Sequence, residues 1–412
     1  MTDRAAERVV IDRVGHQGDG VAKTPAGPVF VPYTLPGETA AVEKMGERAK
    51  LIEVVTASSE RIAAICPYFG TCGGCALQHW QEKFYRQWKR DLIVAALDYE
   101  GIRAEIGDLI DVHGKGRRRV VLHAKCGSGK NLTVGFTARR SHTIVEIDRC
   151  PVLAQPLARV FEIGRRIAEI LAPMVKPLDI QFTATEGGLD VDVRGSGSIN
   201  SKLISSLAKI TADEGLARLT RHGEVVTQLH EAVVTIGRAR VMLPPGVFLQ
   251  ATEMGETALA DTVISAIGRA KHIADLFCGV GTFALRLAEH AKLFAVDSDA
   301  PAIAALSRAA KTPGLKPVEA IVRDLFRRPL VATELKDYDT VVLDPPRQGA
   351  ETQARELAQS NIARAVYVSC NPASFARDAK ILSQSGFKLL RVTPFDQFRY
   401  SPHVELIGVF ER

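Results

Sequence analysis

The sequence has no apolar run close to the ~18 residues that a membrane-spanning helix requires. Its first residues, Met1 to Arg8, contain no apolar stretch of the kind that forms the core of a signal peptide. We therefore expect a cytoplasmic protein without a membrane partner. The dinucleotide-binding pattern Gly-x-Gly-x-x-Gly is also absent, and so is the Cys-x3-Cys-x2-Cys pattern of radical enzymes.

What the sequence does contain fits a globular protein of several domains. Its 412 residues exceed what one hydrophobic core usually organises, so we expect two or three domains. In a reducing compartment its seven cysteines indicate metal, cluster or catalytic roles rather than disulfides. The net charge is +6, and basic residues gather as a polyanion-binding surface would require, although a solvated helix face also explains each group. The groups are Lys83, Arg86, Lys89 and Arg90; Lys115, Arg117, Arg118 and Arg119; and Arg139 with Arg140.

Residues 1–57 predict a small β-barrel of the oligonucleotide-binding kind. Short apolar runs at 9–11, 29–31, 40–42 and 51–55 are separated by glycine- and proline-containing turns. The segments Gly18-Asp-Gly-Val-Ala22 and Val29-Phe-Val-Pro-Tyr-Thr-Leu-Pro-Gly37 also resemble the TRAM domain of RNA-modifying enzymes.

Three cysteines follow closely in Cys66-Pro-Tyr-Phe-Gly-Thr-Cys72-Gly-Gly-Cys75. Thiolates at this density favour a soft metal, and the two glycines permit the tight bend that turns the sulfurs to one point. We predict Cys150 as the fourth ligand, because a proline follows it as one follows Cys66, a habit of iron–sulfur loops. The prediction is a [4Fe-4S] cluster with a structural or redox-sensing role. Zinc is the alternative occupant, although four-cysteine zinc sites normally use two close pairs.

Residues 58–245 predict a middle domain of mixed α and β structure that carries this cluster site. Residues 80–97 predict an amphipathic helix, and we place Lys89 on its polar face with the other basic residues of the segment. Strand-like runs follow at 119–124, 132–136, 179–183, 191–193 and 231–235, with a helix near 157–171. The arginines at 117–119 would suit phosphate contacts to a nucleic acid.

From residue 246 to 412 strand and helix alternate, which predicts an α/β domain with a parallel, doubly wound sheet. A strand at 273–276 turns into a helix through Gly279 and Gly281, which let a ligand approach the backbone. The next strand ends in Asp297, a carboxylate suited to both hydroxyls of a ribose. Later strand ends supply Asp324 and Asp344.

Cys370 also lies at the end of a predicted strand. The β-branched run Val366-Tyr-Val368 predicts a buried strand that must stop by Asn371-Pro372, because proline has no N–H for the ladder. Ligands bind at the carboxyl edge of open α/β sheets, so a thiol there is placed for chemistry. The alternative is that Cys370 is a small buried hydrophobic residue.

Four motifs together resemble the RNA uracil-5 methyltransferases of the TrmA/RumA family. They are Asp275-Leu-Phe-Cys-Gly-Val-Gly281, Leu343-Asp-Pro-Pro-Arg-Gln-Gly349, Val368-Ser-Cys-Asn-Pro-Ala-Ser-Phe-Ala-Arg-Asp378 and His403-Val-Glu405. The resemblance covers nearly the whole chain and implies a Rossmann-like class I methyltransferase domain that binds S-adenosylmethionine. It further implies cofactor contacts from Gln250, Phe277, Thr282, Asp297, Asp324 and Asp344.

The chemistry implied by this resemblance needs a nucleophile and a base. Carbon 5 of uracil attacks a sulfonium methyl only after a thiolate has added to carbon 6, which is covalent catalysis. Cys370 is the predicted nucleophile, and by resemblance Glu405 is the base that removes the proton from carbon 5.

Several alternatives stay open for the substrate. The barrel and the cluster favour 23S rRNA over the tRNA T-loop, and we expect a monomer that binds RNA. A cytosine-5 methyltransferase would also use a cysteine, and a cluster-bearing RNA-binding protein without activity is a further possibility.

Overall fold

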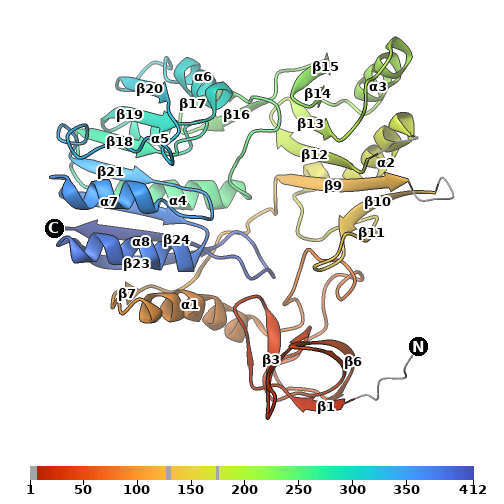
Figure 1. The fold of residues 1–412 in the computed structure, drawn as a ribbon. Coiled ribbons are helices and arrows are strands. Elements are labelled where there is room, and N and C mark those ends of the chain that lie inside the picture. Colours follow the sequence, from red (N-terminus) through yellow and green to blue (C-terminus); the bar gives the residue numbers. More distant parts are fainter. Residues whose placement is uncertain (1–6, 127–130, 173–175) are drawn as a thin grey trace.

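The computed structural model describes residues 7–126, 131–172 and 176–412. Three regions follow one another along the chain: a small β region, a middle domain and a C-terminal domain, which Figure 1 shows as separate groups of strands. Among the described residues, no helix combines the length and apolar character needed to cross a bilayer.

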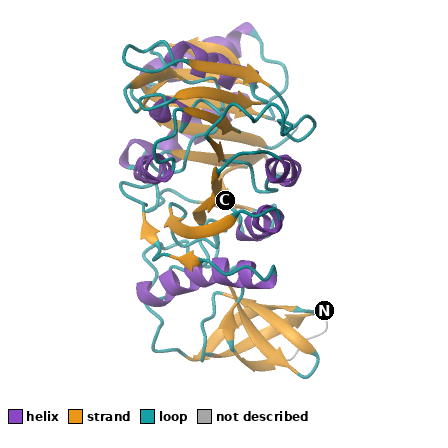
Figure 2. Ribbon diagram, turned by 90° about the vertical axis from the view of Figure 1, so that its left-hand side faces the viewer, coloured by secondary structure: helices purple, strands orange, loops and turns teal. Residues whose placement is uncertain are grey.

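The N-terminal region is a curved sheet of six strands in the order β1-β5-β6-β4-β3-β2, wrapped around apolar side chains such as Val9, Val31 and Val42. Figure 2 shows it as a group of strands without helices at one end of the molecule. The predicted runs form β1, β4, β5 and β6, and the strand after the Gly18 turn, β3, is an addition. The bounds are β1 Glu7–Val10, β2 Arg13–Val14, β3 Asp19–Thr24, β4 Gly27–Pro32, β5 Thr39–Met45 and β6 Arg48–Thr56.

The middle domain is a seven-stranded sheet in the order β11-β10-β9-β12-β13-β14-β15, with helices α2 and α3 packed on one face. Strand β9 shows why the sheet has two different faces. Its residues Val120, Leu122 and Ala124 enter the core beneath the helices, whereas Arg119 and His123 point to the other side. The bounds are β9 Arg119–Cys126, β10 Leu132–Thr137, β11 Ile144–Glu146, a 3-10 turn at Gln155–Leu157, α2 Val160–Leu171, β12 Leu178–Thr185, β13 Gly188–Arg194, α3 Ser201–Asp213, β14 Arg218–Arg221 and β15 Glu224–Gln228.

A hairpin leads from the middle domain to the C-terminal domain, whose sheet has the order β20-β19-β18-β21-β22-β24-β23-β7. Strands β18 to β22 are parallel, and β24 runs antiparallel between β22 and β23. Helices cover both faces, as Figure 2 shows. The bounds are β16 Val233–Ile236, β17 Ala239–Met242, α4 Glu253–Ala266, β18 His272–Leu276, α5 Ala284–Leu287, β19 Lys292–Asp297, α6 Ala300–Ala309, β20 Val318–Val322, β21 Thr340–Leu343, α7 Glu351–Gln359, β22 Arg364–Ser369, α8 Pro372–Gln384, β23 Lys388–Asp396 and β24 Glu405–Glu411.

Residues 82–111 lie with the C-terminal domain, although the prediction assigned them to the middle domain. Helix α1 (Glu82–Tyr99) buries Ile93 and Leu97 in the same core as the strands of the large sheet. The short strands β7 (Glu105–Ile106) and β8 (Ile110–Asp111) pair with β23 and extend this sheet. Sequence order therefore does not match spatial order here, because the edge of the large sheet is completed by an earlier segment.

Candidate active site

The predicted site residues converge at the carboxyl edge of the large sheet. Asp297, Asp344 and Cys370 each stand at or just beyond the end of a parallel strand, namely β19, β21 and β22. Strand β24 is antiparallel to β22, with Ser369 opposite Leu406, so its first residue Glu405 lies beside Cys370 at the same edge. The antiparallel strand thus explains how residues far apart in the chain meet at one point.

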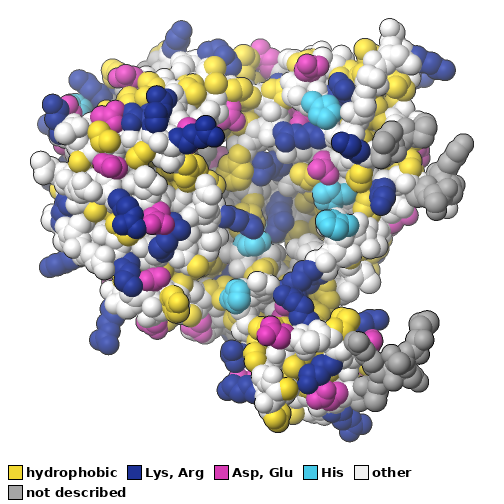
Figure 3. Space-filling model, in the orientation of Figure 1, with side chains coloured by type: hydrophobic (Ala, Val, Ile, Leu, Met, Phe, Trp, Pro, Cys, Tyr) yellow, Lys and Arg dark blue, Asp and Glu magenta, His cyan; other side chains and the backbone are white. Residues whose placement is uncertain are grey.

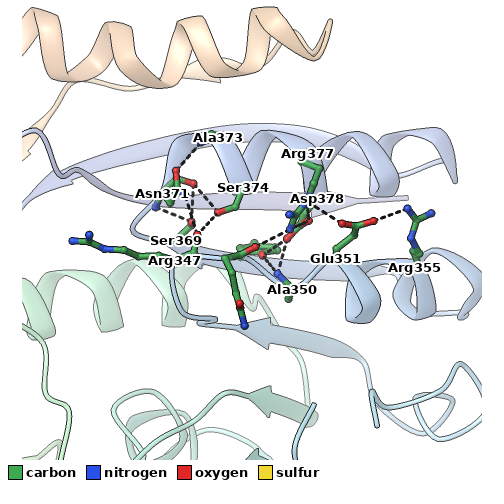
Figure 4. A network of polar contacts seen from close by, with 12 residues as sticks. Arg347, Ala350, Glu351, Arg355, Ser369, Asn371, Ala373, Ser374, Arg377 and Asp378 are labelled. Atoms are coloured by element: carbon green, nitrogen blue, oxygen red, sulfur yellow. Dashed lines mark hydrogen bonds and ion pairs between the residues drawn. The ribbon is translucent and has the colours of Figure 1, made fainter. Parts of the chain in front are cut away.

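Two loops that carry these residues are tied together by the motif around Cys370. Asn371 caps α8 through the Ala373 amide (3.1 Å), and its side-chain amide donates to the Arg347 carbonyl (2.8 Å). The Ser374 hydroxyl donates to the same carbonyl (3.0 Å), and Figure 4 shows the side chains turned toward one another. The motif therefore fixes the loop after Asp344 relative to the loop that holds the thiol.

The Cys370 thiol is half-buried in a place that disfavours its anion. Burial, together with the negative charges of Glu405 and Asp344, raises the pKa of Cys370 to about 11, and Arg347 offsets part of this rise. Burial and Asp344 likewise raise the pKa of Glu405 to about 8. Glu405 and Asp344 thus lie close enough to the thiol to disfavour its anion.

A chain of amides holds the carboxylate of Asp344. The Gln250 side chain donates to Asp344 Oδ2 (3.3 Å) and accepts from the Gln397 amide (2.8 Å). Gln397 is fully buried, and its oxygen accepts from the Ala251 backbone amide (2.9 Å). Gln397 was absent from the sequence predictions because nothing in its neighbourhood marks it, and only the fold brings it beside Gln250.

The other predicted cofactor residues lie around the first turn of the parallel sheet. Asp297 accepts from the Gly279 amide (2.9 Å), which places its carboxylate across the glycine turn that follows β18. Phe277 has φ +63°, and its ring centre lies 5.3 Å from that of Phe326, with the two rings tilted by 46°. Asp324 follows β20 and accepts from the Phe326 amide (2.9 Å), and Thr282 is half-buried directly after Gly281.

The charge of this edge fits a cationic ligand. The Asp275 carboxylate is fully buried and accepts no well-formed hydrogen bond from the described residues. Its burial and the neighbouring Asp344 hold its pKa well above the usual range. Burial and Asp297 raise the pKa of Asp344 to about 7. Three carboxylates that repel one another suit a ligand that carries a positive charge, as the sulfonium of S-adenosylmethionine does.

Comparison with known proteins agrees with this geometry. The family described as tRNA (Uracil-5-)-methyltransferase matches residues 246–412, and the TRAM domain matches residues 3–43. A 23S rRNA (uracil(1939)-C(5))-methyltransferase of Chromohalobacter salexigens is 32% identical over 100% of this chain and 90% of its own. The chain belongs to the RNA uracil-5-methyltransferase family.

Other relatives extend the similarity over the full length. An RNA methyltransferase of Brucella suis is 43% identical over 100% of this chain and 99% of its own. The solved structure of a Pyrococcus abyssi tRNA (uracil-54, C5)-methyltransferase with S-adenosyl-L-homocysteine has a TM-score of 0.75, at 23% identity, over 98% of this chain and 100% of that chain. The predicted fold is thereby confirmed: an N-terminal TRAM domain and an α/β methyltransferase domain of the S-adenosylmethionine-dependent kind.

The four predicted cluster cysteines of this methyltransferase lie around one cavity of about 360 Å³ between the middle and methyltransferase domains. Figure 3 shows a hollow between the two lobes, with Lys and Arg side chains along its walls. Burial, with the thiolates of Cys150 and Cys72 adding to it, raises the pKa of Cys75 to about 12. Cys66 and Cys150 line the same cavity, so the structure brings the distant fourth cysteine to the three that are close in sequence.

The geometry for a single metal ion is not formed. Within 7–126, 131–172 and 176–412, no group of three or more His, Cys, Asp or Glu side chains is arranged to hold a metal ion. The cluster therefore stays a prediction, which rests on the shared cavity and on the soft thiol donors. His79, which follows the motif, is 2% exposed and packs its ring 5.1 Å from that of Phe69.

The basic groups have more varied roles than the sequence indicated. The prediction for Lys89 was wrong: it is fully buried, not on the solvated face of α1. Arg90 donates to the Ile106 carbonyl (3.0 Å), and Arg140 pairs with Asp19 of the TRAM domain (2.7 Å). The helical period could have placed Lys89 correctly, because it lies four residues from both Tyr85 and Ile93, which are buried.

Two arginines of the 117–119 group line the cavity next to aromatic rings. The Arg119 guanidinium lies 4.9 Å from the ring centre of Phe248, and that of Arg117 lies 5.6 Å from Phe398. Phe248 is 61% exposed, which is unusual for so large an apolar side chain. Arginine–aromatic pairs of this kind can stack unpaired bases and contact phosphates.

Proposed function

We propose that this methyltransferase transfers the methyl group of S-adenosylmethionine to carbon 5 of a uridine in RNA through a covalent adduct with Cys370. The observation that carries the proposal is the adjacency of Cys370 and Glu405 at the sheet edge that also gathers Asp297 and Asp344. A nucleophile, a base and a cation-binding edge are the three parts that this chemistry requires.

The bonds change in four steps. The Cys370 thiol first loses its proton to solvent water. Its sulfur then bonds to carbon 6, which shifts an electron pair toward carbon 5 and oxygen 4. Carbon 5 then takes the methyl group from the sulfonium, which leaves as a neutral thioether. Glu405 removes the remaining proton from carbon 5, and the released electron pair restores the ring double bond and expels the Cys370 thiolate.

The protonation states of the site support this order. The pKa of about 8 at Glu405 lets it accept a proton and release it near neutral pH, as a general base must do. The pKa of about 11 at Cys370 keeps the thiol protonated while the edge holds only carboxylates. A cation bound beside Asp344 would lower the pKa of both groups, because an opposite charge favours an anion.

We assign the cofactor contacts to six residues on the basis of their place at the edge. Asp297 faces the glycine turn and is suited to the ribose hydroxyls, while Gln250 and Asp344 form one hydrogen-bonded unit beside the sulfonium position. We place Phe277 and Asp324, which both contact Phe326, at the far end, where the adenine ring would lie, and we assign Thr282 from its position directly after Gly281.

For the substrate we propose 23S rRNA. The support is the Chromohalobacter salexigens relative, which acts on that RNA according to its name. The TRAM-like barrel is weaker support than the sequence suggested, because the Pyrococcus abyssi tRNA enzyme matches 98% of this chain. The tRNA T-loop and a cytosine substrate are therefore outcomes that the experiment below must separate. Cytoplasmic location and a monomeric state stay predictions from the sequence.

We also propose that Cys66, Cys72, Cys75 and Cys150 hold a [4Fe-4S] cluster. In such a cluster each cysteine binds a different iron, so its sulfurs lie further apart than the ligands of a single ion. A cavity lined by four thiols accommodates that arrangement. The cluster would cross-link the middle domain to the segment that precedes α1.

The test uses the full-length protein with S-adenosylmethionine that carries a labelled methyl group, and unmodified 23S rRNA and tRNA transcripts. We expect label at carbon 5 of a uridine in the rRNA transcript alone. Label in the tRNA transcript alone would replace the substrate assignment, and label on cytosine would replace the base.

Glu405→Gln supplies the second part of the test. This variant should transfer the methyl group and then stall, because the elimination step has lost its base. General base catalysis contributes about 10²–10⁴-fold to the rate of such a step. The expected readout is a labelled protein–RNA band that survives denaturation. A Glu405→Gln enzyme that turns over freely, with no such band, would contradict the role of Glu405.

A further inference from the structure

Helix α1 contributes a fully buried lysine to the methyltransferase domain. The Lys89 ammonium pairs with the Asp396 carboxylate and donates to the backbone carbonyls of Phe398 (3.1 Å) and His403 (2.7 Å). Its side chain is 0% exposed, so all three ammonium protons are used inside the protein. All three acceptors belong to residues 396–403, which link β23 to β24.

Neighbouring groups hold the same loop. The Tyr85 hydroxyl donates to Asp396 Oδ2 (2.6 Å) and accepts from the Tyr400 amide (2.9 Å). The Tyr400 carbonyl accepts from the amides of Ala76 (2.8 Å) and Leu77 (3.1 Å). Tyr400 has φ +64°, a conformation that a bulky residue keeps only when its surroundings enforce it.

The loop has functional groups at both of its ends. Gln397, which follows Asp396, belongs to the amide chain that holds Gln250 and Asp344. At the other end His403 hydrogen-bonds Arg347 (3.0 Å between the two side-chain nitrogens), and Glu405 begins β24 two residues later. The position of Lys89 therefore fixes the segment from which Glu405 enters the site.

We propose that Lys89 is a positioning residue for the methylation reaction, because it anchors the 396–403 loop so that Glu405 faces carbon 5 of the uracil, next to the carbon bonded to Cys370. The inference rests on the proposed function, since it assigns Lys89 to the step in which Glu405 removes a proton.

The burial of Lys89 supports a positional role over a purely stabilising one. Breaking a buried ion pair by removing one partner leaves a costly unpaired charge, yet replacing both partners with neutral groups is often close to neutral for stability. A neutral side chain could fill the space of Lys89, but it would not bond the Phe398 and His403 carbonyls. Those two bonds define where the loop lies.

Lys89 also acts on Glu405 through its charge. The charged and titratable groups that face Glu405 are Asp344 and Arg347 from the loop after β21, Cys370 from the end of β22 and Lys89 from α1. Arg347 and Lys89 favour the carboxylate form, whereas Asp344 opposes it. Loss of the Lys89 charge should therefore move the pKa of Glu405 further upward.

The experiment compares Lys89→Met with Lys380→Met, which changes an exposed lysine on α8. Both variants are given labelled S-adenosylmethionine and the RNA that the wild-type enzyme methylates, or the 23S transcript if none is known. We expect Lys89→Met to lower turnover roughly ten- to hundred-fold, as misplacement of a catalytic group does. We also expect the methylated covalent adduct to accumulate, and the rising limb of the pH–rate profile to move to higher pH. Lys380→Met should behave as wild type in all three measurements.

A second variant guards against misfolding. Lys89→Met with Asp396→Asn removes both charges, so no unpaired charge is left in the core, and circular dichroism should show the wild-type fold. Adduct accumulation in this double variant supports the proposal. A folded double variant with wild-type adduct level and pH profile would overturn it.

The outcomes also separate this inference from the proposed function. If wild type forms no adduct with any transcript and Glu405→Gln traps none, the covalent mechanism itself fails. If Glu405→Gln traps adduct and the Lys89 variants do not, only the role of Lys89 is wrong.

Discussion

The carboxylate edge and the cysteine cavity are built in opposite ways. The edge collects Asp297, Asp344 and Cys370 from successive strand ends of one sheet, so hydrogen-bonded register determines where each side chain stands. The cavity collects three cysteines from one short loop and Cys150 from a segment 75 positions beyond Cys75 in the sequence. Its shape depends on how two domains pack.

Both regions bring together groups whose charged forms repel, but they differ in how far the protein alone completes them. At the edge, Gln250, Gln397 and the Gly279 amide already hold the carboxylates at hydrogen-bonding distance. In the cavity the thiols of Cys72, Cys75 and Cys150 have raised pKa values, and the described ranges contain no ion-binding geometry there. The edge is therefore held by hydrogen bonds of the protein itself, whereas the cavity gathers its four thiols through the packing of two domains.

The substitution with the largest expected effect alters the carboxylate edge and leaves the cysteine cavity unchanged. Cys370→Ala should abolish methyl transfer, because it removes the thiol that lies beside Glu405 and would activate carbon 5. The measurement is label transfer to the transcript that wild type methylates, with Cys126→Ala, at the end of β9, as the matched control. Iron content should be equal in wild type and both variants. Transfer by Cys370→Ala above background would contradict the nucleophile assignment.

The converse experiment removes one thiol of the cysteine cavity and leaves the carboxylate edge unchanged. Cys150→Ser should reduce protein-bound iron and its visible absorbance toward background, because the fourth thiolate is lost. Cys126→Ser should leave both unchanged, since Cys126 does not line the cavity. Iron is measured on protein purified without oxygen. Zinc in place of iron in the wild-type protein would show that the cysteines bind zinc and would contradict the cluster proposal.

A smaller effect is expected on cofactor binding when one carboxylate of the edge is changed. Asp344→Asn removes the charge that faces the sulfonium position, and hydrogen bonds to charged groups contribute about 1.5–3 kcal/mol. We expect the dissociation constant of S-adenosylmethionine to rise roughly ten- to hundred-fold, measured by calorimetry. Asp324→Asn should have less effect, because the Asp324 carboxylate is already engaged by the Phe326 amide. Equal effects of the two variants would contradict the assignment of Asp344 to the sulfonium.

The smallest expected effect is the dependence on pH. Glu405 must be ionised to act as a base, and its pKa is raised to about 8 in the free enzyme. The value of kcat/KM should therefore increase with pH through about 8 and lie roughly tenfold below its plateau at pH 7. The Glu405→Gln variant should lack this limb. A flat profile for wild type between pH 6 and 9 would mean that Glu405 does not titrate in the reaction.

The predictions that succeeded depended on local patterns. The strand that ends before Cys370, the glycine turn after β18 and the carboxylates at later strand ends all lie where the alternation of strand and helix placed them. The helix at Ser201–Asp213 went unnoticed in a middle domain whose periodic signals are weak. The fate of Lys89 was missed because its polarity was weighed more heavily than its spacing from Tyr85 and Ile93.

By itself the sequence determined which chemical groups are present and which of them end a strand, because backbone propensity and proline placement act over a few neighbouring residues. Three features follow from the tertiary fold alone. The antiparallel strand β24 brings Glu405 to Cys370, Gln397 hydrogen-bonds Gln250, and Lys89 is buried against the 396–403 loop. These pairings join residues up to 314 positions apart, as between Lys89 and His403. Burial and register over such separations are fixed by the packing of the whole domain, which no short stretch of sequence contains.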